Sequence, residues 1–323
     1  MFHASNACSS IDTLRPTRKI YLCFLAATGV SPNREMTMGI TSHPRLRTRL
    51  PPGEFRFIQV GAGPIGVGGL GCVYRIRVTD SNARGIAVGS DGAMKRLNRK
   101  WNQHPEMRER FEREILTLQR MDHPNIVTCT GENLPGGERF YVMPLFANSV
   151  RAHIAANGFR GDWRAIARCG ATLADALHYA LGLGFIHRDF KPDNILFNDG
   201  GPLVIADWGL GYFVHRDSQV LQSLTRGGMG TEYYCSIEQW GTGKCDCRGD
   251  IYSLGMTLDE WVTGHQRRIT VGSGIDGDST RENSIGARRF NALLKSMTQT
   301  YKSQRPSSMN IVAAELRAAA EMA

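Results

Sequence analysis

The chain has 323 residues, of which 41% are hydrophobic and 21% charged, and its formal net charge is +9. This length and composition are ordinary for a soluble globular protein and allow two modest lobes with a sizeable core. Eight cysteines are scattered without a CxxC pair, which argues against a structural zinc site and suits a reducing, cytoplasmic compartment. No long run of Lys or Arg marks a nucleic-acid surface, so no nucleic-acid partner is expected.

Residues 1–54 form a basic segment with seven Lys or Arg against three Asp or Glu. An apolar run at residues 20–30 has only eleven residues, which is too short for a membrane-spanning helix, so no membrane span is expected. We predict a poorly ordered tail, with a targeting segment or a translation start further along the chain as alternatives. Pro51-Pro52-Gly53 punctuates the change to folded sequence, and the domain is predicted to begin at Phe55.

The first half of the folded part is predicted to be a sheet with one helix. Apolar residues recur at helical spacing over residues 105–121, with Glu and Arg on the other faces, which predicts an amphipathic helix against a sheet. Four segments are predicted to be strands. A hairpin loop separates the second strand from the third, and a connector follows the fourth. The strands are residues 55–60, 72–78, 93–97 and 140–143, the loop is 80–92, and the connector is 144–149.

The second half is predicted to be helical. Asp162 is a candidate N-cap for the first of its helices, and Gly264 is a candidate stop for the second. The predicted helices are residues 163–181, 250–262, 287–297 and 309–320, with a mobile Gly/Ser/Asp-rich loop at 272–284. A strand-rich part followed by a helix-rich part predicts an α+β, bilobal architecture with a cleft between the lobes.

The most informative motif is His187-Arg-Asp-Phe-Lys-Pro-Asp-Asn194. Within six positions, Asp189 can accept a hydroxyl proton, Lys191 can neutralise the charge of a phosphoryl group during its transfer, and Asn194 can hold a divalent metal. This run resembles the catalytic loop of the protein kinases, and Lys191 resembles their serine/threonine branch. The resemblance implies a protein-kinase-like fold with a small β-rich N-lobe at residues 55–143, a hinge at 144–149 and a helical C-lobe at 150–323.

A glycine-rich segment, Gly66-Val-Gly-Gly-Leu-Gly-Cys-Val73, resembles the kinase loop that covers the phosphates of ATP. Gly61-Ala-Gly-Pro-Ile-Gly66, with Asp80 downstream, also resembles a dinucleotide-binding fingerprint. That fingerprint requires a helix after the glycines, whereas residues 72–78 alternate like a strand. The ATP-binding residues that the kinase resemblance implies here are Ile65, Gly66, Val67, Gly68, Gly69, Leu70, Gly71, Cys72 and Val73.

Three further acidic and basic residues match the same family. Lys95 resembles the kinase lysine that grips the α- and β-phosphates, and Glu114, nineteen residues later, resembles its helix partner. Asp207-Trp208-Gly209 resembles the metal-binding D-F-G turn, with Trp replacing Phe. The resemblance therefore implies Mg²⁺, with Mn²⁺ as a substitute, held by Asn194 and Asp207.

Elements after this turn also occur in family order. Ser236-Ile-Glu238 resembles A-P-E, with Ile237 in place of Pro, and its Glu is expected to meet Arg305. If that pair is buried, breaking it from one side should cost about 3 to 5 kcal/mol. Asp250 resembles the aspartate that braces the catalytic loop.

The resemblance implies transfer of the γ-phosphoryl group of ATP to Ser or Thr hydroxyls of protein substrates. The purine is expected among Val73, Ala93, Met143, Phe146 and Leu196. Phosphorylation of the protein by itself is expected at Ser218, Ser223 or Thr225, with Arg188 receiving the phosphate. The alternatives are a pseudokinase or nucleotide-binding scaffold and, further off, a dinucleotide-binding oxidoreductase.

Overall fold

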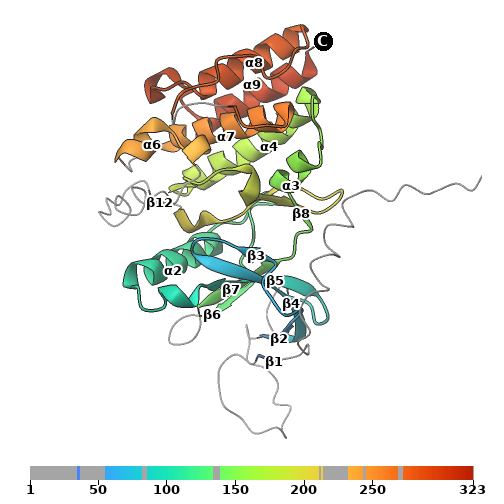
Figure 1. Cartoon of the computed structure of the whole chain (residues 1–323), viewed down its shortest axis with the longest axis vertical. Helices are drawn as coiled ribbons and strands as arrows, with labels where there is room; N and C mark the ends of the chain where they lie inside the picture. Colours follow the sequence, from blue (N-terminus) through green and yellow to red (C-terminus); the bar gives the residue numbers. More distant parts are fainter. Residues whose placement is uncertain are drawn as a thin grey trace, which may run out of the picture.

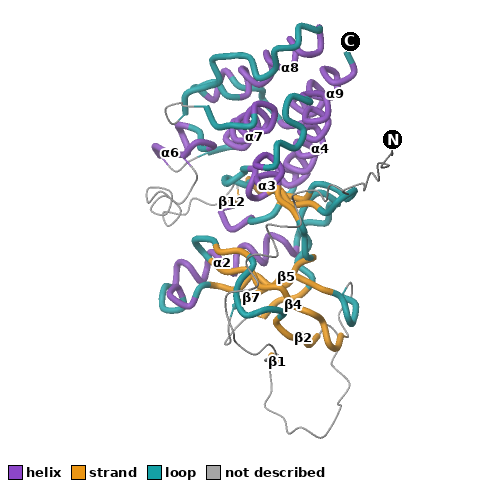
Figure 2. The backbone as a smooth tube through the Cα atoms, turned by 45° about the vertical axis from the view of Figure 1, so that its right-hand side comes forward, coloured by secondary structure: helices purple, strands orange, loops and turns teal. Residues whose placement is uncertain are grey.

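The computed structural model describes residues 35–36, 55–81, 86–133, 139–210, 212–213, 232–242, 245–267 and 272–322. Most of the predicted tail at residues 1–54 lies outside these ranges, as do the three candidate phosphorylation sites Ser218, Ser223 and Thr225. Strands gather at one end of the elongated molecule and helices at the other (Figures 1 and 2). The predicted α+β, bilobal architecture is therefore confirmed.

The strand-rich end is one antiparallel sheet with the order β1-β2-β4-β5-β7-β6, and β3 pairs with β4. Its strands are β1 Glu35–Met36, β2 Phe55–Gln59, β3 Gly66–Val67, β4 Gly71–Ser81, β5 Asp91–Leu97, β6 Gly131–Asn133 and β7 Phe140–Pro144. The predicted strands are all present, and β4 extends further into the predicted hairpin loop because its residues pair with β2 as far as Ser81. A 3₁₀ turn, Arg99–Trp101, leads into α2, Pro105–Gln119, the predicted amphipathic helix.

This sheet is strongly curled, so that its concave side forms a small core of its own. Phe57 in β2 and Phe140 in β7 have ring centroids 5.6 Å apart, although β4 and β5 lie between those strands in the sheet. The ring of Phe55 also covers Gly131 in β6, where an added Cβ would lie 2.2 Å from Phe55 Cε1. Glycine at 131 therefore lets β2 and β6 approach each other.

We expect Gly131→Ala to destabilise the protein, because the methyl group would displace the buried ring of Phe55. Overpacking of this kind typically costs about 1 to 3 kcal/mol, which thermal or chemical unfolding can measure. Gly63→Ala is the matched control, since an added Cβ there has no heavy atom within 4 Å. Equal stability of the two variants would show that the sheet does not close at this point.

The helix-rich end contains all four predicted helices and two short ones that the sequence did not reveal. Its helices are α3 Val150–Ala155, α4 Trp163–Gly182, α6 Ile237–Thr242, α7 Cys247–Thr263, α8 Ile285–Met297 and α9 Met309–Glu321. Its short strands are β8 Asn148–Ser149, β9 Phe185–Ile186, β10 Ile195–Phe197, β11 Val204–Ile205 and β12 Tyr212–Phe213, in the sheets β11-β10-β8 and β12-β9. The 3₁₀ turns are Pro192–Asn194, Trp208–Leu210, Glu232–Tyr234 and Lys302–Gln304.

Local capping explains where two of these helices begin and end. The Asp162 carboxylate accepts a hydrogen bond from Ala165 N, which confirms the predicted N-cap of α4. Helix α7 begins three residues before the predicted start because Asp246 caps it through Arg248 N. Gly264, with φ of 79°, ends α7 in the left-handed conformation, as predicted.

The segment predicted as a mobile loop, residues 272–284, has no regular secondary structure but is anchored to its neighbours. The Ser279 hydroxyl donates to the buried carboxylate of Asp259 at 2.6 Å, and Asn291 accepts hydrogen bonds from the backbone of Ser279 and Thr280. Composition alone pointed to mobility, and it missed these long-range partners.

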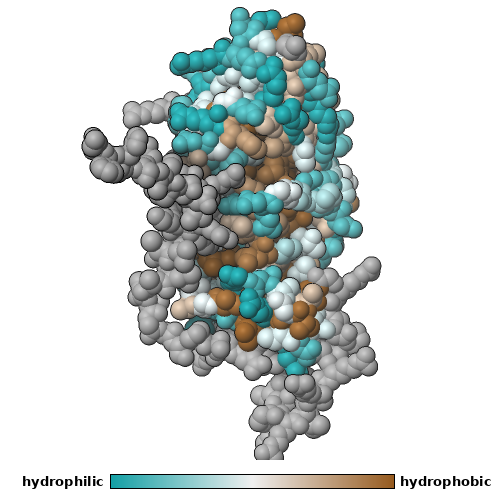
Figure 3. Space-filling model, turned by 90° about the vertical axis from the view of Figure 1, so that its right-hand side faces the viewer, coloured by the Kyte–Doolittle hydropathy of each residue, from teal (hydrophilic) through white to brown (hydrophobic). Residues whose placement is uncertain are grey.

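One hydrophobic cluster runs through both ends of the molecule. It contains α2 side chains such as Phe111 and Ile115 and helix side chains such as Leu254. In Figure 3, hydrophobic surface is concentrated in the middle of the face shown. Among the described residues, none of the helices has the length and apolarity to cross a bilayer.

Candidate active site

Asp189, Lys191 and Asn194 converge within one turn between β9 and β10. Lys191 Nζ lies 3.0 and 2.9 Å from the two carboxylate oxygens of Asp189. Asn194 Nδ2 donates to the Asp189 carbonyl oxygen at 2.8 Å and reaches its Oδ2 at 3.3 Å. Burial raises the pKa of Asp189 to about 6, against the opposing charge of Lys191. The carboxylate is therefore held in place and is more basic than in water.

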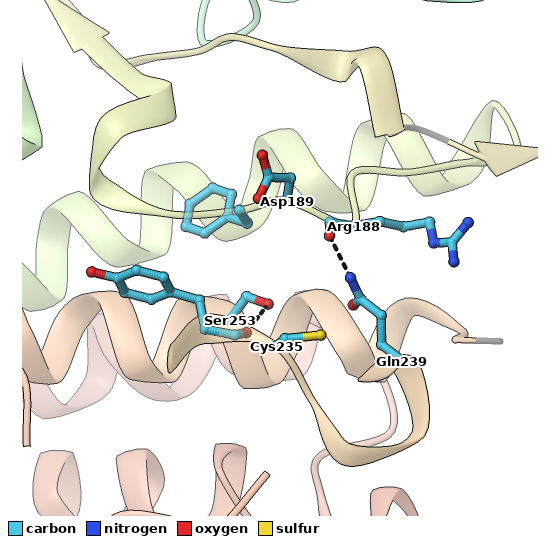
Figure 4. A pocket seen from close by; sticks show the side chains of 7 residues that line it. Arg188, Asp189, Cys235, Gln239 and Ser253 are labelled. Carbon is cyan, nitrogen blue, oxygen red and sulfur yellow. Dashed lines mark hydrogen bonds between the residues drawn. The ribbon is translucent and has the colours of Figure 1, made fainter. Parts of the chain in front are cut away.

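A small pocket lies directly beside Asp189 (Figure 4). Across it, Gln239 Nε2 donates to the carbonyl oxygen of Arg188 at 2.6 Å. The pocket is lined by Arg188, Asp189, Phe190, Tyr234, Cys235, Gln239 and Ser253. Helix α6 and the turn before it thereby support the backbone that carries the catalytic candidate.

The carboxylate of Asp250, in the first turn of α7, holds the backbone just before Asp189. The Asp250 carboxylate accepts hydrogen bonds from His187 N at 2.7 Å and from Arg188 N at 2.8 Å. These two bonds hold Arg188 in the left-handed region, with φ of 67°, which is costly for a residue other than glycine. Burial raises the pKa of Asp250 to about 6, and the two N–H donors oppose the rise.

His187 joins this turn to the segment that ends in Asp207. Its Nδ1 accepts from Asp189 N at 3.2 Å, and its Nε2 lies 3.0 Å from the carbonyl oxygen of Ala206. Since Nδ1 must be an acceptor, the proton belongs on Nε2. Burial lowers the pKa of His187 to about 4, so the imidazole is a neutral bridge at physiological pH.

We expect Asp250→Asn to weaken both folding and turnover, because an amide offers only one acceptor oxygen to the two N–H groups. A buried donor left without a partner costs about 1 to 3 kcal/mol. Unfolding by denaturant measures the stability, and the initial rate measures turnover. Asp278→Asn is the control, because its ion pair with Lys295 is exposed on both sides. An Asp250→Asn variant as stable as this control would contradict the proposed brace.

Lys95 bonds to Glu114, as the matching positions predicted, and it also bonds to Asp207. Its Nζ lies 2.7 and 3.0 Å from the Glu114 carboxylate oxygens and 2.8 Å from Asp207 Oδ1. Burial disfavours the ammonium, but Asp207 and Glu114 outweigh it and raise the pKa of Lys95 above its usual range. Although burial also disfavours the Asp207 carboxylate, Lys95 holds the pKa of Asp207 well below its usual range. Lys95 and Asp207 therefore stabilise each other in their charged forms.

The turn Trp208–Leu210 holds Asp207 beside α2. Asp207 has a φ of 60°, and the Trp208 ring is buried, with its centroid 4.6 Å from that of His187. The indole N–H of Trp208 donates to the carbonyl oxygen of Ile205 at 3.3 Å. Tryptophan thus fits the slot expected for phenylalanine and leaves the carboxylate of Asp207 in place.

Asn194 and Asp207 are suited to a divalent metal. Asn194 donates a hydrogen bond to Asp189 through Nδ2, so its side-chain amide oxygen is left to act as a metal ligand. Lys95 bonds to only one carboxylate oxygen of Asp207. The backbone carbonyl oxygen of Asn194 also accepts from Ala206 N at 2.8 Å, which joins the turn before β10 to the segment after β11 that leads to Asp207. Oxygen donors of this kind are what Mg²⁺ prefers. Within the described ranges, no group of three or more His, Cys, Asp or Glu side chains forms another candidate metal centre.

The glycine-rich segment forms a β-hairpin, not a strand-to-helix turn. Ile65 N donates to Val73 O at 2.7 Å and Gly68 N to Gly71 O at 2.8 Å, and β3 pairs Val67 with Cys72. An added Cβ at Gly69 would have open space, whereas one at Gly71 would lie 2.5 Å from the carbonyl oxygen of Arg96. The hairpin contradicts the dinucleotide reading, and Gly71 is required by packing against β5.

The residues predicted around the purine belong to one hydrophobic cluster. Ala93 and Met143 are direct cross-strand neighbours in β5 and β7. Both are buried in the large cluster, and Leu70 also packs there. The partly buried side chains of Val73, Phe146 and Leu196 pack against the same cluster. Met143, Ala93 and Val73 come from the sheet and Leu196 from β10, so the cluster joins both ends of the molecule.

Glu238 and Arg305 form the predicted pair. Arg305 Nη1 lies 2.7 Å from Glu238 Oε1, and Nη2 lies 3.0 Å from Oε2. The Arg305 side chain is fully buried. Burial was the condition under which breaking the pair from one side was expected to be costly. Ile237, which stands where the family has Pro, opens α6 with a partly exposed side chain.

Two functional candidates were missed from the sequence. Arg110, one turn before Glu114 in α2, is buried and donates from Nε to the carbonyl oxygen of Gly209 at 2.9 Å. Tyr141 in β7 donates its hydroxyl to Glu114 Oε1 at 2.8 Å. The only available signal was the spacing of Arg110, which lies four residues before Glu114, on the same helix face.

Comparison with known proteins agrees with this geometry. The family model described as "Protein kinase domain" matches residues 61–316. A probable serine/threonine-protein kinase of Clostridium acetobutylicum is 30% identical over 62% of this chain and 29% of its own length. Serine/threonine-protein kinase PknK of Mycobacterium tuberculosis is 36% identical over 62% of this chain and 17% of its own. A receptor-like serine/threonine-protein kinase of Arabidopsis thaliana is 30% identical, over 62% of this chain and 54% of its own length. The chain thus matches only part of each relative.

Proposed function

The chain belongs to the protein kinase domain family, and from that premise we propose that it transfers the γ-phosphoryl group of ATP to Ser or Thr hydroxyls of protein substrates. One observation carries the proposal. The contact of His187 with Ala206 joins the turn of Asp189, Lys191 and Asn194 to the segment of Asp207, and Asp207 in turn bonds to Lys95, the partner of Glu114.

Each residue has a defined task in this reaction. Asp189, more basic than a free carboxylate, orients the substrate hydroxyl and accepts its proton as the phosphorus–oxygen bond forms. Lys191, bonded to Asp189, neutralises charge on the transferred group. Lys95 holds the α- and β-phosphates while Glu114 fixes its position. Asn194 and Asp207 would hold the Mg²⁺, which neutralises phosphate charge when bound.

Lys191 and the similarity to serine/threonine-protein kinases both favour Ser and Thr as acceptors. We extend the proposal to autophosphorylation between Asp207 and Glu238, where three candidate hydroxyl residues occur. Arg188 would then receive the phosphate. The domain assignment is also part of this proposal, with an N-lobe at 55–143, a hinge at 144–149 and a C-lobe from 150. So is a cytoplasmic location.

A pseudokinase or scaffold is the second candidate. Loss of the lysine, the proton acceptor or the metal-binding aspartate would favour it, but Lys95, Asp189 and Asp207 are all present and correctly grouped. The complete set favours catalysis.

The test is an assay of the purified chain with labelled ATP, Mg²⁺ and generic basic protein substrates. We expect label on Ser or Thr of the substrate in the wild-type reaction and almost none, over the same time, in a parallel reaction with Asp189→Asn. Nucleotide binding without any label transfer by the wild type would favour the scaffold instead.

A further inference from the structure

Tyr141 links the sheet directly to the carboxylate of α2. It lies in β7 as the cross-strand neighbour of Lys95, and its side chain is 1% exposed. Its ring packs against Phe111 of α2, with centroids 5.8 Å apart, and its hydroxyl donates to Glu114 Oε1 at 2.8 Å. A rigid aromatic side chain held at both ends is a precise anchor for a hydrogen bond.

Glu114 depends on such anchors because it is fully buried. Burial raises the pKa of Glu114, while Lys95 and the Tyr141 hydroxyl oppose the rise. Lys95, however, is shared with Asp207 and is the group that must contact the phosphates. Of these two partners, Tyr141 is the one whose bond to Glu114 comes from a hydroxyl that is not shared with Asp207.

The position of Glu114 in turn sets the position of the D-W-G turn. A Cβ at Gly209 would lie 3.0 Å from Glu114 Oε2, and Arg110 on the same helix face bonds to the Gly209 carbonyl oxygen. Helix α2 therefore contacts Lys95 through Glu114 and the D-W-G turn through Arg110.

We propose that Tyr141 is a positioning residue for phosphoryl transfer: its hydroxyl fixes Glu114, and so keeps α2 and Lys95 in the productive arrangement without relying on Lys95 itself. The assignment rests on the proposed kinase function for its kinetic consequence, but the anchoring of α2 does not depend on that function.

The kinetic test uses Tyr141→Phe, which removes one oxygen and retains the ring. We expect kcat to fall roughly tenfold with the KM for ATP changed by less than about twofold, because orientation is lost and the purine site is intact. In the Glu114→Ala background, which leaves the hydroxyl no acceptor at this position, Tyr141→Phe should have little further effect, since the hydroxyl acts through that carboxylate. An unchanged kcat, or an equal loss in both backgrounds, would overturn the proposal.

The control is Tyr252→Phe, which removes a hydroxyl that donates to the Ser273 carbonyl oxygen at 2.9 Å from an equally buried ring. It should lower the melting temperature but leave kcat unchanged. A loss of kcat in this variant equal to that of Tyr141→Phe would mean that the effect is only general destabilisation, and would overturn the assignment.

Amide hydrogen exchange tests the anchoring without any activity. Tyr141→Phe should speed exchange in α2, residues 105–119, and not in α4, whereas Tyr252→Phe should leave α2 unchanged. If the wild type transfers no phosphate, the kinase proposal fails, while faster exchange in α2 still supports the anchor and unchanged exchange removes it.

Should Tyr141→Phe not fold, Tyr141→Phe/Glu114→Gln should fold, because no buried carboxylate has then lost a partner. Failure of that rescue would also end the proposal.

Discussion

Asp189→Asn is expected to lower the rate of phosphoryl transfer by roughly 10²- to 10⁴-fold, because an amide cannot accept the substrate proton. The substitution keeps the size of the side chain, and Asn194 can still bond to the carbonyl oxygen of residue 189. Nucleotide affinity should change little, since Lys95 and the purine cluster lie on other elements. Single-turnover kinetics and ATP binding by calorimetry measure the two quantities separately.

Asp199→Asn is the matched control for this variant. Asp199 lies in the exposed turn after β10, and its carboxylate accepts a hydrogen bond from the side chain of Asn148 at 3.3 Å. Both substitutions remove one negative charge, so general electrostatics would affect them alike. A transfer rate for Asp189→Asn within a fewfold of that for Asp199→Asn would remove Asp189 as the proton acceptor.

The principal site could be predicted from the sequence because its members sit in short, spaced motifs. Asp189, Lys191 and Asn194 lie within one turn, so their proximity follows from chain geometry alone. Lys95 and Glu114 required a further inference, namely that a strand and the next helix pack face to face. Their ion pair at 2.7 Å confirms that inference.

The residues that were missed act through contacts between segments far apart in the chain. Arg110 bonds to Gly209, ninety-nine residues away, and Gly131 is needed only because the ring of Phe55 covers it. No local pattern encodes such contacts, since they depend on how far the sheet curls and on where the D-W-G turn lies. For the same reason the anchors of the segment at residues 272–284, Asp259 on α7 and Asn291 on α8, were not predicted.

Lys95→Met is expected to affect both activity and stability. Loss of a preorganised cation for the phosphates should lower kcat by roughly 10²- to 10³-fold. The variant also leaves Glu114 buried without its cation, and breaking a buried pair from one side costs about 3 to 5 kcal/mol. Because Lys95 is 8% exposed and Glu114 is fully buried, solvent cannot compensate for the loss.

The two effects can be separated by a second substitution. In Lys95→Met/Glu114→Gln, the uncompensated charge is gone, so the free energy of unfolding should recover in part while activity stays lost. The stability deficit of Lys95→Met should also shrink as the pH falls, because an unpaired buried carboxylate has a raised pKa and the folded state then takes up a proton. Denaturant unfolding at several pH values measures this. A deficit that does not depend on pH, together with no recovery in the double variant, would show that the Lys95–Glu114 pair does not hold α2 against the sheet.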